Sequence, residues 1–94
     1  MRKSKADFLE LLASGDYYVL QKEHDRNLDD IVLKREDGLP AEIQNYPYRI
    51  NQMPTYIFRE FLEEGFLKEA GTDELGGTVF RPAGVKRKPS AQAA

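Results

Sequence analysis

Few residues of this chain could act as catalytic groups. Those that could are not spaced so that two of them would act together in catalysis. The only histidine, His24, lies in the polar stretch HDRN, where a solvated turn is expected rather than a general base. Glu63 and Glu64 are adjacent, so on a helix they point about 100° apart and cannot act as a catalytic pair. The same holds for Asp29 and Asp30. We therefore expect a protein that is not an enzyme.

Metal and cofactor sites are equally unsupported by the residue types. The chain has no cysteine, which excludes disulfides, thiol chemistry and zinc sites with cysteine ligands. The glycine-rich stretch GTDELGG, residues 71–77, lacks the lysine of a phosphate-binding P-loop. The N-terminus has no long apolar run typical of a signal peptide, and nothing approaches the roughly 20 apolar residues of a membrane span. We expect no cofactor, no metal and a cytoplasmic location.

Charge is distributed unevenly along the 94 residues, although the formal net charge is only −2. Residues 6–80 hold seven basic residues and all sixteen acids, a balance of −9. The two ends hold only basic charges, which are Arg2, Lys3, Lys5, Arg81, Lys86, Arg87 and Lys88. An acidic body argues against a broad phosphate-binding surface, whereas the basic ends could still reach a polyanion.

Two segments are expected to be helices. In SKADFLELLASGD, Ser4 is a good N-cap, Asp7 completes a capping pattern, and Gly15 supplies a left-handed stop. In PTYIFREFLEEG, Ile57, Phe58, Phe61 and Leu62 form one apolar face, with Asn51 or Thr55 as the cap. Gly65 should end this second helix, with Phe66 as its apolar partner.

The region between these helices is expected to be rich in β-structure. Residues 17–20 favour a strand, and the dipeptide Asp37–Gly38 predicts a hairpin whose return strand is cut short by Pro40. Residues 27–36 fit a strand or, with Asn27 as the cap, a short helix. The stretch NYPYRINQMP should be an ordered loop, with Tyr46 and Tyr48 packed over the edge of the core.

The C-terminal part predicts a hairpin followed by a tail. The segments FLKEA and TVFRPA read as two strands around the loop 71–77. Residues 85–94 lose the apolar pattern and are expected to form a flexible basic tail. Residues 1–84 would then be a single domain of α+β class.

The second helix and the hairpin together resemble the winged helix-turn-helix family. The resemblance covers about residues 51–84 and is carried by Leu62, Gly65, Phe66, Leu67, Gly77, Val79, Phe80, Arg81 and Gly84. It implies a small winged-helix-like domain with a recognition helix and a C-terminal wing. One departure is that no usual second helix is evident between the first helix and the recognition helix, unless residues 27–36 form it.

The resemblance also implies a function, which is that of a regulatory DNA-binding protein in transcription. The helix would meet double-stranded DNA with Gln52, Thr55, Tyr56 and Arg59, and the wing and tail would touch the backbone with Arg81, Lys86, Arg87 and Lys88. A homodimer would enlarge the contact, because one such module buries little DNA surface. The acidic second half of the helix requires DNA to approach its N-terminal end.

The alternative is a protein–protein interaction or inhibitory module, bacterial or phage, on the same scaffold. The acidic body and the tyrosines Tyr46, Tyr48 and Tyr56 suit docking on a basic partner, because tyrosine is enriched at interface hot spots. Basic residues gathered beside the N-terminus of the helix would favour DNA, and a continuous acidic surface with tyrosines would favour a protein.

Overall fold

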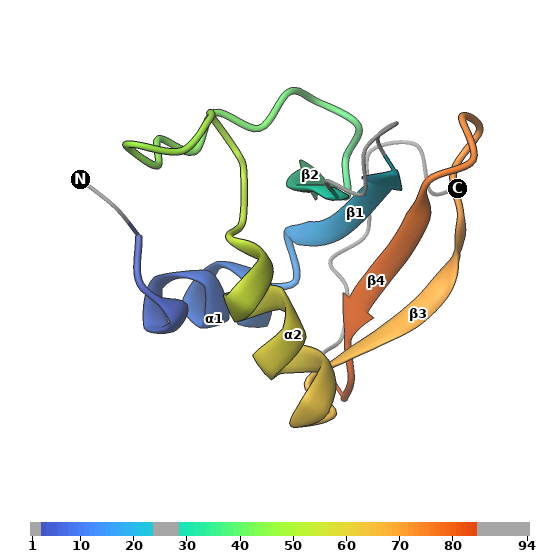
Figure 1. Ribbon diagram of the computed structural model, residues 1–94. Coiled ribbons are helices and arrows are strands. Elements are labelled where there is room, and N and C mark those ends of the chain that lie inside the picture. The colour runs from blue at the N-terminus through green and yellow to red at the C-terminus, as the bar shows by residue number, and fades with distance from the viewer. Residues whose placement is uncertain (1–2, 24–28, 85–94) are drawn as a thin grey trace.

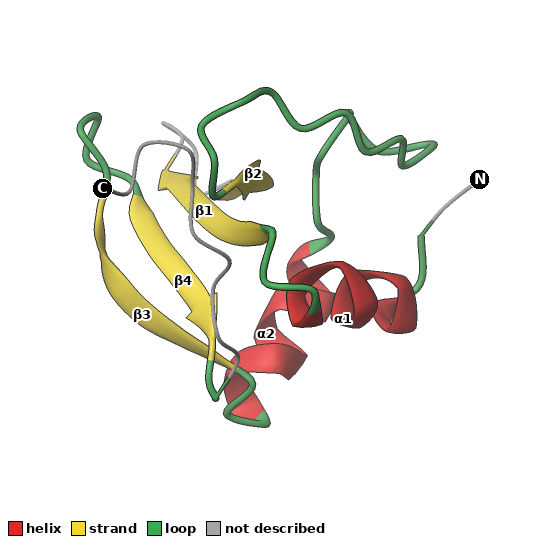
Figure 2. Ribbon diagram, turned by 180° about the vertical axis from the view of Figure 1, so that it is seen from behind, coloured by secondary structure: helices red, strands yellow, loops and turns green. Residues whose placement is uncertain are grey.

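A computed structural model describes residues 3–23 and 29–84 of the chain as a small α+β domain. The elements follow in the order α1 (Lys5–Ala13), β1 (Tyr17–Glu23), β2 (Asp29–Arg35), α2 (Thr55–Glu63), β3 (Leu67–Thr72) and β4 (Thr78–Pro82). The strands form one antiparallel sheet in the order β2-β1-β4-β3 (Figures 1 and 2). The predicted α+β class is therefore confirmed.

Both helices pack against one face of this sheet and enclose the hydrophobic core. Strand residues that alternate toward that face, Val19, Leu33 and Phe80, are buried together with Phe8 of α1 and Phe61 of α2. Period-two alternation leaves the next residues along each strand on the opposite, open face. The sheet thus has a covered face and a face that no described helix covers. Neither described helix is long and apolar enough to cross a membrane.

Helix α1 begins and ends as the sequence predicts. The Ser4 hydroxyl accepts a hydrogen bond from the Asp7 amide, while the Asp7 carboxylate accepts one from the Ser4 amide at 2.7 Å. This reciprocal capping box satisfies two of the amides that a helix N-terminus leaves free. Gly15 follows the helix with φ of 82°, which is the left-handed stop expected there.

The ambiguity at residues 27–36 is resolved in favour of a strand over Asp29–Arg35. This strand, β2, pairs with β1 along its full length, with Tyr18 opposite Lys34 and Lys22 opposite Asp30. Tertiary pairing overrides the helical spacing of its apolar residues, because Ile31 and Leu33 both reach the core from the covered face. His24 and the HDRN turn lie outside the described residues.

Helix α2 and the following turn match the predicted apolar face but not the predicted cap. Pro54 occupies the N-cap position and no side chain caps the helix, so Asn51 and Thr55 do not have the expected role. The C-terminal end is as predicted. Gly65 has φ of 76°, and the Phe66 amide donates to the Phe61 carbonyl at 2.9 Å. The two rings also contact, with centroids 5.0 Å apart.

The predicted hairpin β3–β4 is present, but β3 starts at Leu67 and runs to Thr72, into the predicted loop. The hairpin also makes one strand contact that the sequence did not predict. Strand β4 pairs on its other side with β1, through Val19 opposite Phe80. A register shift interrupts the β3–β4 ladder between Glu69 and Thr72. The strand that follows α1 is therefore joined edge to edge with the hairpin that follows α2.

The hairpin predicted at Asp37–Gly38 is wrong. Gly38 makes a tight turn with φ of 81°, but the chain then runs irregularly to α2 instead of returning as a strand. Only a single bridge, Val32 to Gln52, touches the sheet, flanked by backbone hydrogen bonds between β2 and residues 51–53. Pro40, which has no amide hydrogen, cannot extend a ladder next to the turn.

Candidate nucleic-acid interface on α2 and the hairpin

Helix α2 is held by its apolar face and turns a polar stripe outward. Ile57, Phe58 and Phe61 are buried, and the Phe58 ring packs edge-on against Phe80 of β4 with centroids 4.9 Å apart. Residues on the other side of the helix are exposed, among them Tyr56 at 52% and Arg59. Within the part of the chain that the structure describes, Arg59 makes no ion pair. Its guanidinium is thus available to an anionic ligand.

The four residues predicted to contact DNA lie at or just before the start of α2, but they differ in how exposed their side chains are. Thr55, Tyr56 and Arg59 lie on the first turns of α2, with Thr55 half-buried. Gln52 precedes the helix and is also half-buried. Its side-chain oxygen accepts from the Arg49 amide at 3.1 Å, so its acceptor already has a role in the loop. Tyr56 and Arg59 remain the most exposed of the four.

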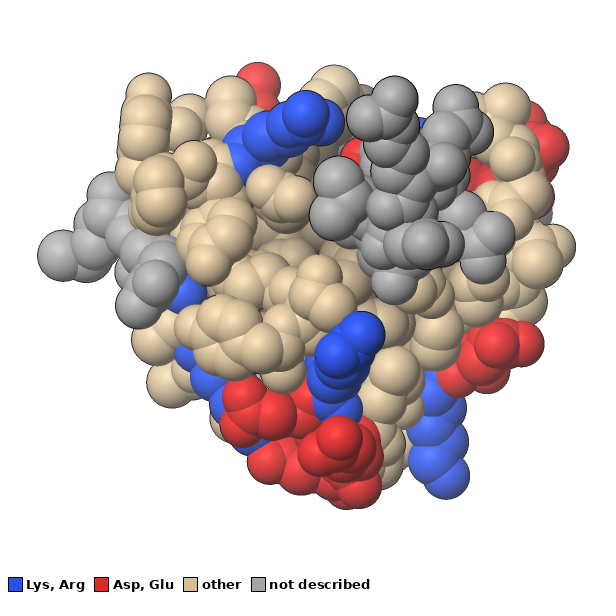
Figure 3. Space-filling view, viewed as in Figure 1, with Lys and Arg blue, Asp and Glu red and all other residues tan. Residues whose placement is uncertain are grey.

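The C-terminal half of α2 is acidic, and part of that charge is paired with α1. Lys5 Nζ donates to Glu64 Oε2 at 2.5 Å and to Glu60 Oε1 at 3.3 Å. These contacts, chiefly the one to Glu64, raise the pKa of Lys5. Glu63 is exposed. Figure 3 shows acidic side chains gathered over the lower end of α2, below a broad uncharged area.

Arg81, predicted as a contact of the wing, lies instead on the open face of the sheet. Its guanidinium makes two hydrogen bonds to Glu36, at 2.9 and 3.0 Å, and stands over the Tyr18 ring with 5.0 Å to the centroid. The pair with Glu36 raises the pKa of Arg81, and burial raises that of Tyr18. Arg81 thus ties β4 to the turn after β2. Lys86, Arg87 and Lys88 lie outside the described residues.

The loop at the tip of the hairpin is held by an acidic side chain, Asp73, and not by a basic one. Asp73 Oδ1 accepts from the Gly77 amide at 2.6 Å and from the Leu75 amide at 3.1 Å. Glu74 next to it is exposed. Lys68, near the start of β3, is the exposed cation of the described hairpin. The spacing of Asp73 and Gly77 could have indicated this turn from the sequence, because aspartate often accepts hydrogen bonds from its own loop backbone.

The segment before α2 carries large exposed side chains. Tyr46 is 69% exposed, so it does not pack over the core as predicted, whereas Tyr48 is half-buried. Ile50, which was not singled out, is 54% exposed. Asn45 and Asn51 hold this segment through side-chain bonds to its own backbone.

In residues 3–23 and 29–84, no three His, Asp or Glu side chains lie close enough together to hold a metal ion. No protein-family model matches the chain, and no curated protein or solved structure matches it.

Proposed function

We propose that this protein is a small, non-enzymatic, cytoplasmic module of winged-helix type that binds double-stranded DNA. The observation that carries the proposal is the exposed N-terminal half of α2, which offers Thr55, Tyr56 and Arg59 and is followed directly by the hairpin β3–β4. An arginine can donate two hydrogen bonds to guanine, and hydroxyl groups can bind phosphate or base edges.

The N-terminus of α2 is also the end that suits phosphate. Its N-cap residue is Pro54 and no described side chain caps the helix. The Ile57 and Phe58 amides donate to the Pro54 carbonyl, so the amides of Thr55 and Tyr56 are the ones offered to a ligand. The helix dipole places partial positive charge at the same end. The exposed Glu63 lies at the other end, so DNA would approach the first turns and avoid the last.

The hairpin contributes less than the sequence suggested. Asp73 and Glu74 at its tip would repel phosphate, and Lys68, opposite Arg81 in the β3–β4 ladder, lies on the open face away from α2. The proposed contacts beyond the helix are therefore Lys86, Arg87 and Lys88 from the sequence. Arg81 leaves the proposed contact set, because its charge is paired with Glu36 on the open face of the sheet. A homodimer would supply a second copy of this small contact area.

Fluorescence anisotropy with a mixed-sequence duplex across a salt series tests the proposal. Wild-type protein should bind at low salt and weaken as salt rises, with about one unit of slope for each phosphate contact. Arg59→Ala should weaken binding, whereas Lys34→Gln, which removes one positive charge from the open face of the sheet, should not. Failure to bind at low salt, or equal losses in both variants, would overturn it.

A protein partner is the second candidate function, and one observation favours it. Tyr46, Ile50 and Tyr56 are large apolar residues, each more than half exposed, on α2 and the segment before it. Such residues mark interaction sites when they gather on one surface. A partner retained in a pull-down by wild type and Arg59→Ala, but lost with Ile50→Asp, would support this candidate. Retention by all three proteins would count against it.

A further inference from the structure

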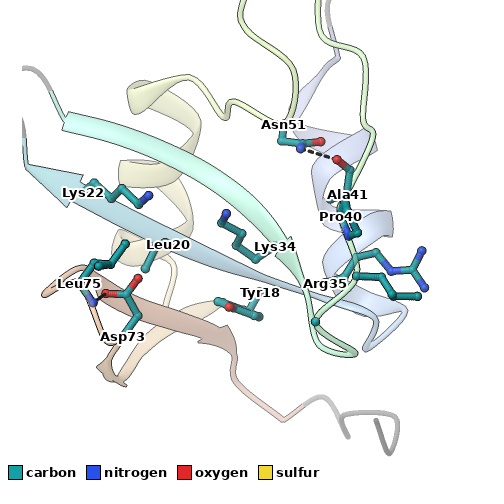
Figure 4. A pocket seen from close by; sticks show the side chains of 12 residues that line it. Tyr18, Leu20, Lys22, Lys34, Arg35, Pro40, Ala41, Asn51, Asp73 and Leu75 are labelled. Carbon is teal, nitrogen blue, oxygen red and sulfur yellow. Dashed lines mark hydrogen bonds between the residues drawn. The ribbon is translucent and has the colours of Figure 1, made fainter. Parts of the chain in front are cut away.

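The open face of the sheet carries a cavity that the proposed DNA contact does not use. It has a volume of about 500 Å³ and lies between the turn at residues 38–41 and the hairpin tip at residues 73–75 (Figure 4). Small-molecule sites typically span about 300–1,000 Å³. Tyr18 and Leu20 of β1 are among the residues that line it. Its upper rim is fixed by the Asn51 side chain, which donates to the Ala41 carbonyl at 2.6 Å.

The cavity is positively charged, although the protein as a whole is acidic. Its ionic lining consists of three cations, Lys22, Lys34 and Arg35, and one carboxylate, Asp73. Arg35 is already paired with Asp37, and Asp73 is bonded to the amides of its own loop. Within the described parts of the chain, neither Lys22 nor Lys34 has an ion-pair partner. Neither ammonium group is therefore held in a direct ion pair by a described residue, although Asp30 lies opposite Lys22 in the ladder.

The strand register aims these two lysines at a common volume. Lys34 lies opposite Tyr18 and Lys22 opposite Asp30, so the two lysines are four residues apart along the ladder, about 13 Å. Figure 4 shows their side chains extending toward each other over Leu20. A single anion between them could contact both ammonium groups, and lysine is a common phosphate ligand.

The rim of the cavity is apolar and exposed. Leu39 is 59% exposed and Leu75 is 83% exposed, on opposite sides of the opening, and Pro40 stands beside the first. Exposed leucines at the mouth of a charged cavity suit a ligand that has an apolar, flat part as well as an anionic one.

We propose that this cavity binds a phosphate monoester of nucleotide size, with the phosphate between Lys22 and Lys34 and the base against Leu39 and Leu75. The two lysine charges match the charge of a phosphate monoester near neutral pH. The same chemistry is offered by a free nucleotide and by the phosphorylated end of a nucleic-acid strand. The site is separate from α2, so it does not depend on the proposed duplex contact.

Amide chemical-shift mapping of the full chain tests the site, with adenosine monophosphate as the probe and adenosine as the control lacking phosphate. The monophosphate should shift the signals of residues that line the cavity, and adenosine should bind at least about fivefold more weakly. Lys22→Gln and Lys34→Gln should each weaken the monophosphate about fivefold. Lys68→Gln, which removes one positive charge outside the cavity, should leave its affinity unchanged.

Three results would overturn the site: no shifts with the monophosphate, equal binding of adenosine, or an equal loss in Lys68→Gln. A 5′-phosphorylated single-stranded oligonucleotide separates the two sources. If the oligonucleotide occupies the cavity at a lower concentration than adenosine monophosphate does, the natural ligand is the phosphorylated end of a strand. Otherwise the natural ligand is a free nucleotide. Duplex binding by Lys22→Gln and Lys34→Gln should match wild type, so loss of the cavity site and loss of the DNA contact at α2 are distinguishable.

Discussion

We expect Asn51 to stabilise the segment before α2 more than any other residue outside the hydrophobic core. It has φ of 67°, a left-handed conformation that costs an ordinary side chain about 1 kcal/mol. Its side-chain oxygen accepts from the Ile43 amide and its nitrogen donates to the Ala41 carbonyl, both at 2.6 Å. Each such bond contributes about 1 kcal/mol. Asn51→Ala should therefore lower the free energy of unfolding by about 3 kcal/mol.

Asn51→Gly separates the two contributions, because glycine adopts positive φ without strain but makes no side-chain bonds. It should cost about 2 kcal/mol, less than the alanine variant. Urea unfolding followed by circular dichroism measures both, with Gln44→Ala at an exposed position of the same segment as a control that should stay within about 0.5 kcal/mol of wild type. Equal losses in the two Asn51 variants, or losses no larger than the control, would show that Asn51 does not hold this segment in the way described.

Three further predictions concern the ion pair, a cap and the hairpin tip. A double-mutant cycle of Arg81→Met and Glu36→Gln should give a coupling of about 1–2 kcal/mol in urea unfolding, and additive losses would contradict the clamp. Hydrogen bonds from Ser4 hold the pKa of Asp7 below its usual 3.8, so their contribution to stability is present above pH 3.8 and lost as pH falls toward the folded pKa. Asp7→Asn should accordingly show a shallower fall of melting temperature on acidification, whereas a fall as steep as wild type would argue against this role. In Gly77→Ala the new methyl would lie 2.9 Å from Leu20 Cδ1 and 3.2 Å from a backbone carbonyl, so thermal unfolding should show a loss of about 1–3 kcal/mol, and an unchanged melting temperature would contradict the close contact.

The elements whose signals are local were predictable from the sequence. Ser4 and Asp7 form a complete capping box within four residues, and Gly65 with Phe66 ends α2 through contacts that span only a few positions. The hairpin β3–β4 was equally evident from its strand-forming residues and its glycine-rich loop. In each case the physical cause lies within a short window of the chain, which is where propensity and capping rules apply.

The features that depend on distant partners were not predictable. The choice of strand at Asp29–Arg35 is made by pairing with β1, and the failure of the hairpin at Gly38 follows from how residues 39–54 are held by asparagine side chains. Arg81 looked like a free cation next to a basic tail, but its partner, Glu36, lies 45 residues away in the sequence. No local pattern contains that pairing.

The same distinction between local and distant causes applies to the two candidate sites. The polar stripe of Thr55, Tyr56 and Arg59 follows from helical periodicity once the apolar face is known, so the sequence was sufficient to place it. The cavity on the open face required the register of β1 and β2 and the position of two loops. Lys22 and Lys34 are twelve residues apart in the chain and carry no motif.

The proposed contact of DNA with the first turns of α2 can be tested by amide chemical-shift mapping with a short duplex. We expect the largest shifts on Thr55, Tyr56 and Arg59, a decline toward Glu63, and smaller shifts with added salt. Shifts confined to Lys22 and Lys34 on the open face, or none at low salt, would contradict it.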